Sequence, residues 1–236
     1  FGGSLIRPEA TGYGTVYFAN EMLKRHGRSF DGLRVSVSGS GNVAQYAVEK
    51  AMALGARVVT VSDSSGTVYD EAGFTPEKLA LLMEVKNHLY GRVDDYAKRV
   101  GATFLPGQRP WAIPVDVALP CATQNELDGE DAKTLVQNGV RCVVEGANMP
   151  CTLEAITLFE HSGVSYAPGK ASNAGGVATY VRRAFGDRTA AMVGWCFLPS
   201  GMNSVTVMPS ASLPYSLSLA GMRPSARLSA DNSRTI

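Results

Sequence analysis

The stretch from Val35 to Ala44, which reads VSVSGSGNVA, decides the fold of this chain. A β-branched run enters a G-x-G-x-x-A pattern, and a helical pattern follows it directly. Gly39 permits a tight turn, Gly41 lets the backbone approach a pyrophosphate, and Ala44 is small enough for close packing of helix on strand. Amide groups at the start of such a helix, together with the helix dipole, favour an anion. The segment therefore predicts a dinucleotide-binding turn between a strand and a helix.

A second strand, predicted at residues 57–62, ends in an acid. Asp63 lies 19 residues after Ala44, a spacing typical of the acid that accepts a hydrogen bond from the ribose 2′-hydroxyl of NAD and disfavours a 2′-phosphate. Ser64 follows at once, however, and offers a hydroxyl to an anion. Lys86, on a later predicted helix, is either a cation for that anion or a solvated surface lysine. These residues leave the choice between NAD and NADP open.

Apolar strands and helical segments alternate through the first 180 residues. Strands are predicted at residues 33–38, 57–62, 115–119, 141–145 and 164–167. Helices are predicted at residues 8–26, 42–54, 92–100, 128–138 and 151–162, with a further helix that Thr75 caps and Pro76 begins. Strands separated by helices imply right-handed crossovers and helices on both faces of a sheet. We therefore predict that residues 1–180 form an α/β domain with a doubly wound, mostly parallel Rossmann-like sheet.

The composition changes after residue 180. Residues 181–236 contain six Arg but no Lys or Glu, and prolines at positions 199, 209, 214 and 224 would interrupt any helix. No helical or alternating apolar pattern extends there beyond a few residues. We predict an aberrant low-complexity tail that is frameshifted or disordered, with a genuine extension as the alternative. Because residue 1 is Phe, we also expect the chain to be a fragment.

The overall composition argues against several classes of protein. A net charge of +1 gives no electrostatic reason to expect nucleic acid or an anionic membrane as a partner. Apolar runs fall far short of the roughly 20 residues of a membrane span, and we predict a cytoplasmic location. The four cysteines form no C-x-x-C pair, so we expect reduced, buried thiols and no metal site.

Several long motifs together resemble one enzyme family. Residues 1–179 are similar to bacterial NADP-dependent glutamate dehydrogenases. The likeness is carried by residues 2–14 (GGSLIRPEATGYG), 36–45, 62–66 (SDSSG), 119–126 (LPCATQNE), 145–150 (EGANMP) and 173–179 (NAGGVAT). This resemblance implies hydride transfer between NADP and the α-carbon of glutamate, which interconverts glutamate with 2-oxoglutarate and ammonia.

The resemblance also implies roles for individual cofactor-binding residues. Thr11 looks like the threonine near the nicotinamide amide, and Asn42 like the asparagine whose loop backbone meets the pyrophosphate. Ser64 resembles a 2′-phosphate contact, together with Lys86, and Asn148 resembles the asparagine beside the nicotinamide ribose. The alternatives are structural: Thr11 as an ordinary helix residue and Asn148 as a turn former.

Substrate binding and catalysis are only partly represented in the sequence. By resemblance, Asn173 lies at the lip of the substrate cleft, although it is also a plausible loop cap. The family's catalytic lysine and aspartate belong to a preceding domain, so we assign no catalytic residue here and expect the chain alone to be inactive. Tyr180 stands where the family has a serine that contacts the substrate. The resemblance implies a homo-oligomer, hexameric in the family; a non-catalytic dinucleotide-binding fragment and a related amino-acid dehydrogenase remain alternatives.

Overall fold

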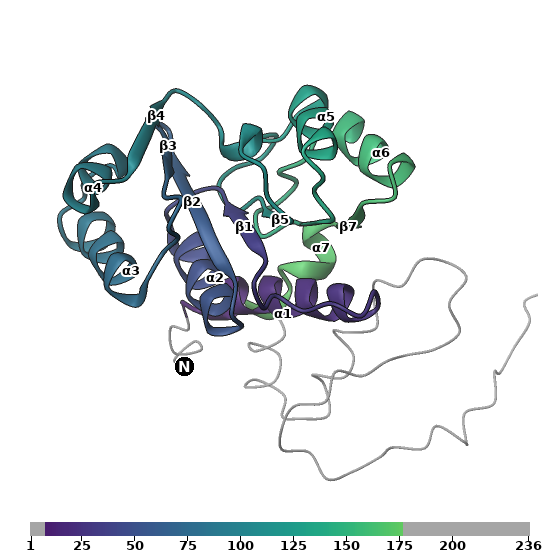
Figure 1. Ribbon diagram of the computed structural model, residues 1–236, viewed down its shortest axis with the longest axis horizontal. Coiled ribbons are helices and arrows are strands. Elements are labelled where there is room, and N and C mark those ends of the chain that lie inside the picture. The colour runs from purple at the N-terminus through teal and green to yellow at the C-terminus, as the bar shows by residue number, and fades with distance from the viewer. Residues whose placement is uncertain (1–7, 177–236) are drawn as a thin grey trace, which may run out of the picture. The chain divides into compact units, whose positions relative to one another are not determined.

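A seven-stranded sheet organises residues 8–176, the part of the chain that the computed structural model describes. Its strand order is β4-β3-β2-β1-β5-β6-β7 (Figure 1). The strands are β1 (Arg34–Val37), β2 (Arg57–Asp63), β3 (Gly66–Tyr69), β4 (Thr103–Pro106), β5 (Val117–Leu119), β6 (Cys142–Val144) and β7 (Ser165–Ala167). The predicted tail, residues 181–236, lies outside the described residues, as do residues 177–180 of the predicted domain.

The five predicted strands are present, and they pair in parallel with their neighbours in the sheet. The prediction of a mostly parallel, doubly wound α/β sheet is therefore confirmed. Strands β3 and β4 were not predicted, and they extend the sheet in antiparallel fashion beyond β2. Asp63 pairs with Gly66, so only Ser64 and Ser65 separate β2 from β3 in a two-residue hairpin. The sequence analysis assigned no secondary structure to the residues that form β3 and β4.

Strand β1 is the point at which the strand order reverses, since β2 pairs on one side of it and β5 on the other. In open α/β sheets, ligands bind in the crevice outside the carboxyl ends of the strands at such a switch point. A ligand site is therefore expected at the turns that follow β1 and β5.

Helices cover both faces of the sheet (Figure 1). They are α1 (Ala10–Lys24), α2 (Asn42–Ala53), α3 (Pro76–Met83), α4 (Val93–Val100), α5 (Gly129–Gln137), α6 (Leu153–His161) and the short α7 (Gly169–Ser172). One buried apolar cluster contains residues of the helices α1, α2, α3 and α4 together with Val35 and Val37 of β1. A second cluster joins α5 and α6 with Ala118 and Val143. Because alternate residues of a strand point to opposite faces, these two clusters are the two sides of a doubly wound domain.

Helix α1 lies directly against the start of α2. A Cβ atom added at Gly12 would come within 2.6 Å of the Val43 carbonyl oxygen and 2.7 Å of the Ala47 amide nitrogen. Only a glycine permits this approach without moving a backbone. Gly12 therefore fixes how closely α1 approaches the helix that follows the phosphate loop.

Helix α3 continues into a π-helix, η1 (Glu84–His88), that has no counterpart in the sequence prediction. Short π-helical turns are rare and occur frequently at functional sites. In this fold η1 carries Lys86 and Asn87 toward the β1–α2 and β2–β3 turns, as their hydrogen bonds show below. Over the described residues, no helix is both long and apolar enough to span a membrane.

Candidate functional site

The two loop glycines after β1 serve different purposes. Gly39 has a φ of +81°, and a Cβ atom there would lie 3.0 Å from the Cys121 carbonyl oxygen. The fold itself therefore requires a glycine at this position. Gly41 has an ordinary φ of −83°, and a Cβ atom there would meet nothing within 4 Å. Protein packing does not explain Gly41, and the open space beside it is available to a ligand.

The start of α2 presents unpaired donors to this space. Gly41 is the N-cap residue and provides no side-chain cap. Within residues 8–176, the amides of Gly41 and Asn42 have no hydrogen-bond acceptor. The Asn42 side chain points elsewhere and donates to the Pro8 carbonyl oxygen at 2.6 Å. Free amides at the positive end of a helix form an anion site of the kind that holds a pyrophosphate.

Asp63, at the end of β2, is surrounded by protein donors. Its carboxylate accepts hydrogen bonds from the Ser65 amide at 2.8 Å, the Ser65 hydroxyl at 2.6 Å and the Val93 amide at 3.1 Å. Lys86 Nζ forms an ion pair with it at 3.2 Å. Burial acts to raise the pKa of Asp63, but the hydrogen bonds from Ser65, Val93 and Lys86 outweigh burial and lower the pKa below its usual value. Asp63 is therefore an ionised residue that holds the hairpin turn.

A cation that the sequence analysis missed lies beside Ser64. Arg92 Nη1 donates to the Ser64 hydroxyl oxygen at 2.6 Å, and both side chains are exposed at this contact. Arg92 immediately precedes α4 and is the N-cap residue of that helix. No sequence signal separated it from other surface arginines, because its nearness to Ser64 depends on how η1 turns the chain back toward β2.

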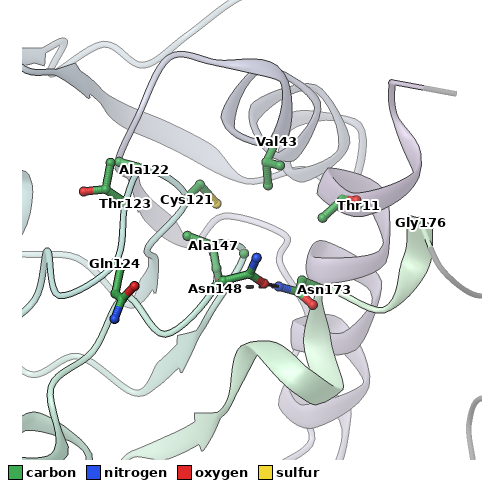
Figure 2. A pocket seen from close by; sticks show the side chains of 11 residues that line it. Thr11, Val43, Cys121, Ala122, Thr123, Gln124, Ala147, Asn148, Asn173 and Gly176 are labelled. Atoms are coloured by element: carbon green, nitrogen blue, oxygen red, sulfur yellow. Dashed lines mark hydrogen bonds between the residues drawn. The ribbon is translucent and has the colours of Figure 1, made fainter. Parts of the chain in front are cut away.

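An open cleft of about 680 Å³ lies at the carboxyl ends of β5 and β6 (Figure 2). It is lined by Thr11, Val43, Cys121, Ala122, Thr123, Gln124, Gly146, Ala147, Asn148, Asn173 and Gly176. Three predicted site residues, Thr11, Asn148 and Asn173, are therefore brought together. Val43, in the first turn of α2, connects this cleft to the phosphate loop. Asp63, Ser64 and Lys86 do not line it and belong to the opposite side of β1.

A hydrogen bond joins the two asparagines at the cleft. Asn173 Nδ2 donates to Asn148 Oδ1 at 2.8 Å and to the Ala147 carbonyl oxygen at 3.3 Å (Figure 2). Met149, which follows Asn148, has a φ of +48° and is exposed. The loop after β6 is thus tied to the segment after β7, so the two asparagines form one wall of the cleft.

Glu145 supports this wall from behind. The residue is 2 % exposed. Its carboxylate accepts hydrogen bonds from the Tyr166 hydroxyl at 2.7 Å, the Gly169 amide at 2.7 Å and the Cys151 amide at 3.3 Å. Its carbonyl oxygen accepts from the Ser172 hydroxyl at 2.5 Å. One side chain therefore joins the loop that bears Asn148 to the segment that bears Asn173; sequence reasoning assigned it no role.

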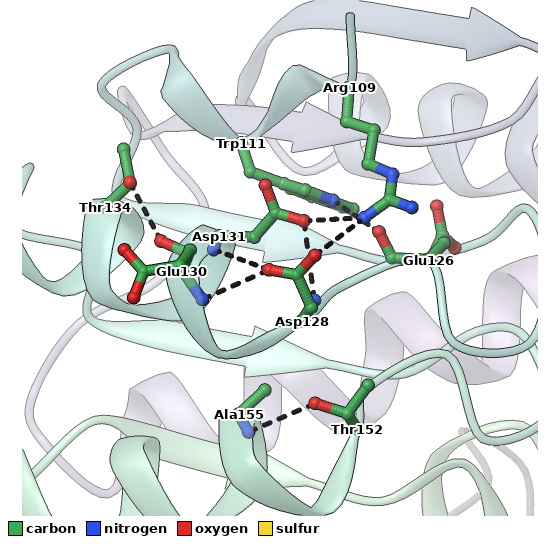
Figure 3. A network of polar contacts seen from close by, with 9 residues as sticks. All are labelled: Arg109, Trp111, Glu126, Asp128, Glu130, Asp131, Thr134, Thr152 and Ala155. Atoms are coloured by element: carbon green, nitrogen blue, oxygen red, sulfur yellow. Dashed lines mark hydrogen bonds and ion pairs between the residues drawn. The ribbon is translucent and has the colours of Figure 1, made fainter.

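Glu126 supports the opposite wall. Its side chain accepts from the Ala122 amide at 2.9 Å. Its backbone carbonyl accepts from Trp111 Nε1 at 3.2 Å, and Figure 3 shows Glu126 beside Trp111. Burial raises the pKa of the Glu126 carboxyl group, against the hydrogen bonds from Ser38 and Ala122. Nearby, Arg109 bridges Asp128 and Asp131 at the capped start of α5, which anchors the chain just beyond this loop.

The thiol in the cleft is a packing group. Cys121 is buried, and a Cβ atom at Gly146 would come within 2.5 Å of its sulfur. Burial raises the pKa of this thiol, which keeps it protonated and unreactive. Cys142 and Cys151 are likewise free and buried. Within the range that the structure covers, no cluster of His, Cys, Asp and Glu residues could hold a metal ion.

The comparison with protein families agrees with this architecture. The family model described as glutamate/leucine/phenylalanine/valine dehydrogenase matches residues 2–181. The chain belongs to this family. The match takes in the phosphate loop, the hairpin turn and both walls of the cleft.

Known members of the dehydrogenase family are closely similar over the same region. The chain is 71 % identical to the NADP-specific glutamate dehydrogenase of Salmonella typhimurium and 54 % identical to the NAD-specific glutamate dehydrogenase of Bacteroides fragilis, over 76 % of the chain in each case. The crystal structure of Plasmodium falciparum glutamate dehydrogenase superposes with a TM-score of 0.74 at 45 % identity, covering 81 % of this chain and 42 % of that one. The predicted resemblance to NADP-dependent glutamate dehydrogenases is confirmed. The chain spans about two fifths of the length of the curated relatives it matches.

Proposed function

We propose that residues 1–180 are the NADP-binding domain of a glutamate dehydrogenase. The observation that carries this proposal is the unfilled space beside Gly41, which faces the unpaired amides at the start of α2. A pyrophosphate satisfies both features, since it accepts from those amides and occupies the space that a side chain would fill. The cleft that begins at Val43 extends toward Thr11 and Asn148, where the nicotinamide half would lie.

The hairpin turn after β2 favours NADP over NAD. An acid at this position disfavours a 2′-phosphate when it is free to accept from the ribose. Asp63 is instead engaged by Lys86 and by the Ser65 and Val93 donors. The exposed groups at the turn are then Ser64 and the guanidinium of Arg92, which suit an anion. Lys86 lies close to this turn as well, and its charge offsets the negative charge of Asp63. The chain is also more nearly identical to the NADP-specific relative than to the NAD-specific one, which favours NADP.

We propose the reaction of the whole protein from the family to which the chain belongs and from its resemblance to glutamate dehydrogenases. It is the reversible oxidative deamination of glutamate to 2-oxoglutarate and ammonia, with Asn173 at the lip of the substrate cleft. The groups that grip the substrate and move its protons are expected in a preceding domain, so this chain contributes the cofactor half. Assembly into a homo-oligomer and a cytoplasmic location remain predictions.

Calorimetric titration of the 236-residue chain with NADP and with NAD tests the binding proposal. We expect NADP to bind with micromolar or weaker affinity, because the cleft of the described residues is open to solvent, and NAD to bind more weakly still. An assay with glutamate and NADP on the same chain should give no turnover. Absence of binding by both dinucleotides would contradict the proposal. Turnover by the isolated chain would contradict the assignment of the catalytic groups to another domain.

A further inference from the structure

The unpaired Gly41 amide has a defined direction, and a buried side chain sets it. Ser40 is 4 % exposed, and its carbonyl oxygen accepts a hydrogen bond from Gln45 Nε2 at 2.8 Å. The described residues contain no cis peptide bond, so the Ser40–Gly41 peptide is trans. In a trans peptide the C=O and N–H groups point in opposite directions. With the Ser40 carbonyl drawn in toward Gln45, the Gly41 N–H is turned away from it, toward the space beside the loop.

Gln45 is in turn held by a residue far along the chain. Its Nε2 donates to Asn87 Oδ1 at 3.1 Å, and Asn87 Nδ2 donates back to Gln45 Oε1 at 3.0 Å. The Gln45 side chain is 1 % exposed, so both ends of its amide need partners. Only one orientation provides them, since the reversed amide would place oxygen against the Ser40 carbonyl and against Asn87 Oδ1. The Ser40 carbonyl therefore fixes the orientation of the Gln45 amide, and Asn87 satisfies and holds the amide in that orientation.

The position of Asn87 depends on the π-helical turn. Asn87 belongs to η1, next to Lys86, which forms the ion pair with Asp63. One short turn thus reaches the phosphate loop through Asn87 and the hairpin turn through Lys86. Two consecutive residues therefore act at two subsites: Lys86 is a cation near the 2′-phosphate subsite, and Asn87 supports the pyrophosphate subsite.

We propose that Gln45 and Asn87 are positioning residues, which hold the Ser40–Gly41 peptide with its N–H directed at the diphosphate of the cofactor. This inference rests on the proposed binding of a dinucleotide and specifies what orients its anion site. Without the pair, the Ser40 carbonyl loses its donor and the peptide can rotate. Rotation would present a carbonyl oxygen to the diphosphate and weaken binding of any ligand that carries one.

Two variants and two ligands test this role. Gln45→Met keeps a side chain of similar shape but removes the donor to the Ser40 carbonyl. Asn87→Ala removes the partner of the Gln45 amide by changing a residue that is itself exposed. The ligands are NADP and adenosine 2′-monophosphate, which has the 2′-phosphate but no diphosphate. Calorimetry measures NADP binding, NMR titration measures the weaker mononucleotide, and thermal unfolding confirms that each variant folds.

We expect Gln45→Met to weaken NADP binding about tenfold or more and Asn87→Ala about threefold to tenfold, as for loss of a hydrogen bond that organises a charged contact. Binding of adenosine 2′-monophosphate should change less than twofold. Parallel losses for both ligands would show a general structural role and overturn the inference, as would NADP affinities equal to that of the unaltered chain. If the unaltered chain itself binds no NADP, the proposed function fails as well, and this result is distinct from the others.

Discussion

Replacing Gly41 by valine should abolish NADP binding while leaving the fold intact. The Gly41 backbone has φ −83° and ψ −168°, which valine adopts without strain. A Cβ atom there meets no protein atom within 4 Å. The remaining effect on stability is the weaker N-cap preference of valine, partly offset by lower entropy in the unfolded chain. We therefore expect the free energy of unfolding to change by no more than about 1 kcal/mol.

The loss in binding should be much larger. The valine side chain occupies the space in which the diphosphate would meet the amides of Gly41 and Asn42. Hydrogen bonds to a charged group contribute about 1.5–3 kcal/mol each, so losing both corresponds to about 3–6 kcal/mol, or more than 100-fold in affinity. Calorimetric titration measures this loss, and urea denaturation of the same sample measures stability. A variant that still binds NADP with the affinity of the original chain would refute the assignment of the phosphate loop.

Gly39→Ala is the matched control, because its glycine is needed for a different reason. Its φ of +81° is strained for any residue with a Cβ atom, and that atom would lie 3.0 Å from the Cys121 carbonyl oxygen. The strain alone costs about 1–2 kcal/mol. We expect this variant to lose stability, whereas the Gly41 variant loses binding. If Gly41→Val unfolds the protein instead, the conclusion that its space is free would be wrong.

Three further predictions follow from the same site. Removing both 2′-phosphate candidates, with Ser64→Ala and Lys86→Ala, should lower the NADP/NAD affinity ratio about 10- to 150-fold; an unchanged ratio would place the 2′-phosphate elsewhere. Glu145→Gln should destabilise the chain by about 1–3 kcal/mol in urea denaturation, because an amide cannot accept from all three donors; an equally stable variant would show that the junction behind the cleft is dispensable. For Glu126, whose folded pKa is raised, stability is greatest below the unfolded pKa of about 4.3 and falls as the pH rises through the folded pKa. Glu126→Gln should remove that fall from the pH profile of unfolding, and an identical profile would mean that burial does not oppose ionisation of this carboxyl group.

The parallel part of the fold was predictable because its strands are short β-branched or apolar segments that alternate with longer helical segments. The two antiparallel strands were not, for reasons of length and composition. Strand β3 (Gly66–Tyr69) follows β2 after two serines, and β4 (Thr103–Pro106) is four residues long and ends in proline. The π-helix η1 (Glu84–His88) gives no sequence signal, since its residues are compatible with an ordinary helix.

The candidate site was predictable where a residue belongs to a sequence motif and was missed where the fold brings in a distant segment. Thr11, Asn148 and Asn173 were predicted from motifs, and they do line one cleft. Arg92 and Asn87 were not predicted, because their contacts with Ser64 and Gln45 join residues 28 and 42 positions apart. Such long-range contacts have no period or spacing by which a single sequence could reveal them.

The arrangement of these groups explains why cofactor binding and catalysis can be separated. In a parallel sheet the carboxyl ends of the strands share one edge, so the turns after β1, β2, β5 and β6 all open toward the same side. Each turn is held by contacts within residues 8–176: the phosphate loop by Gln45, the hairpin by Asp63 and the cleft wall that bears Asn148 by Glu145. None of these supports depends on a second domain. The described part of the chain thus carries its own candidate anion site and both walls of the cleft, so cofactor binding can be tested apart from catalysis.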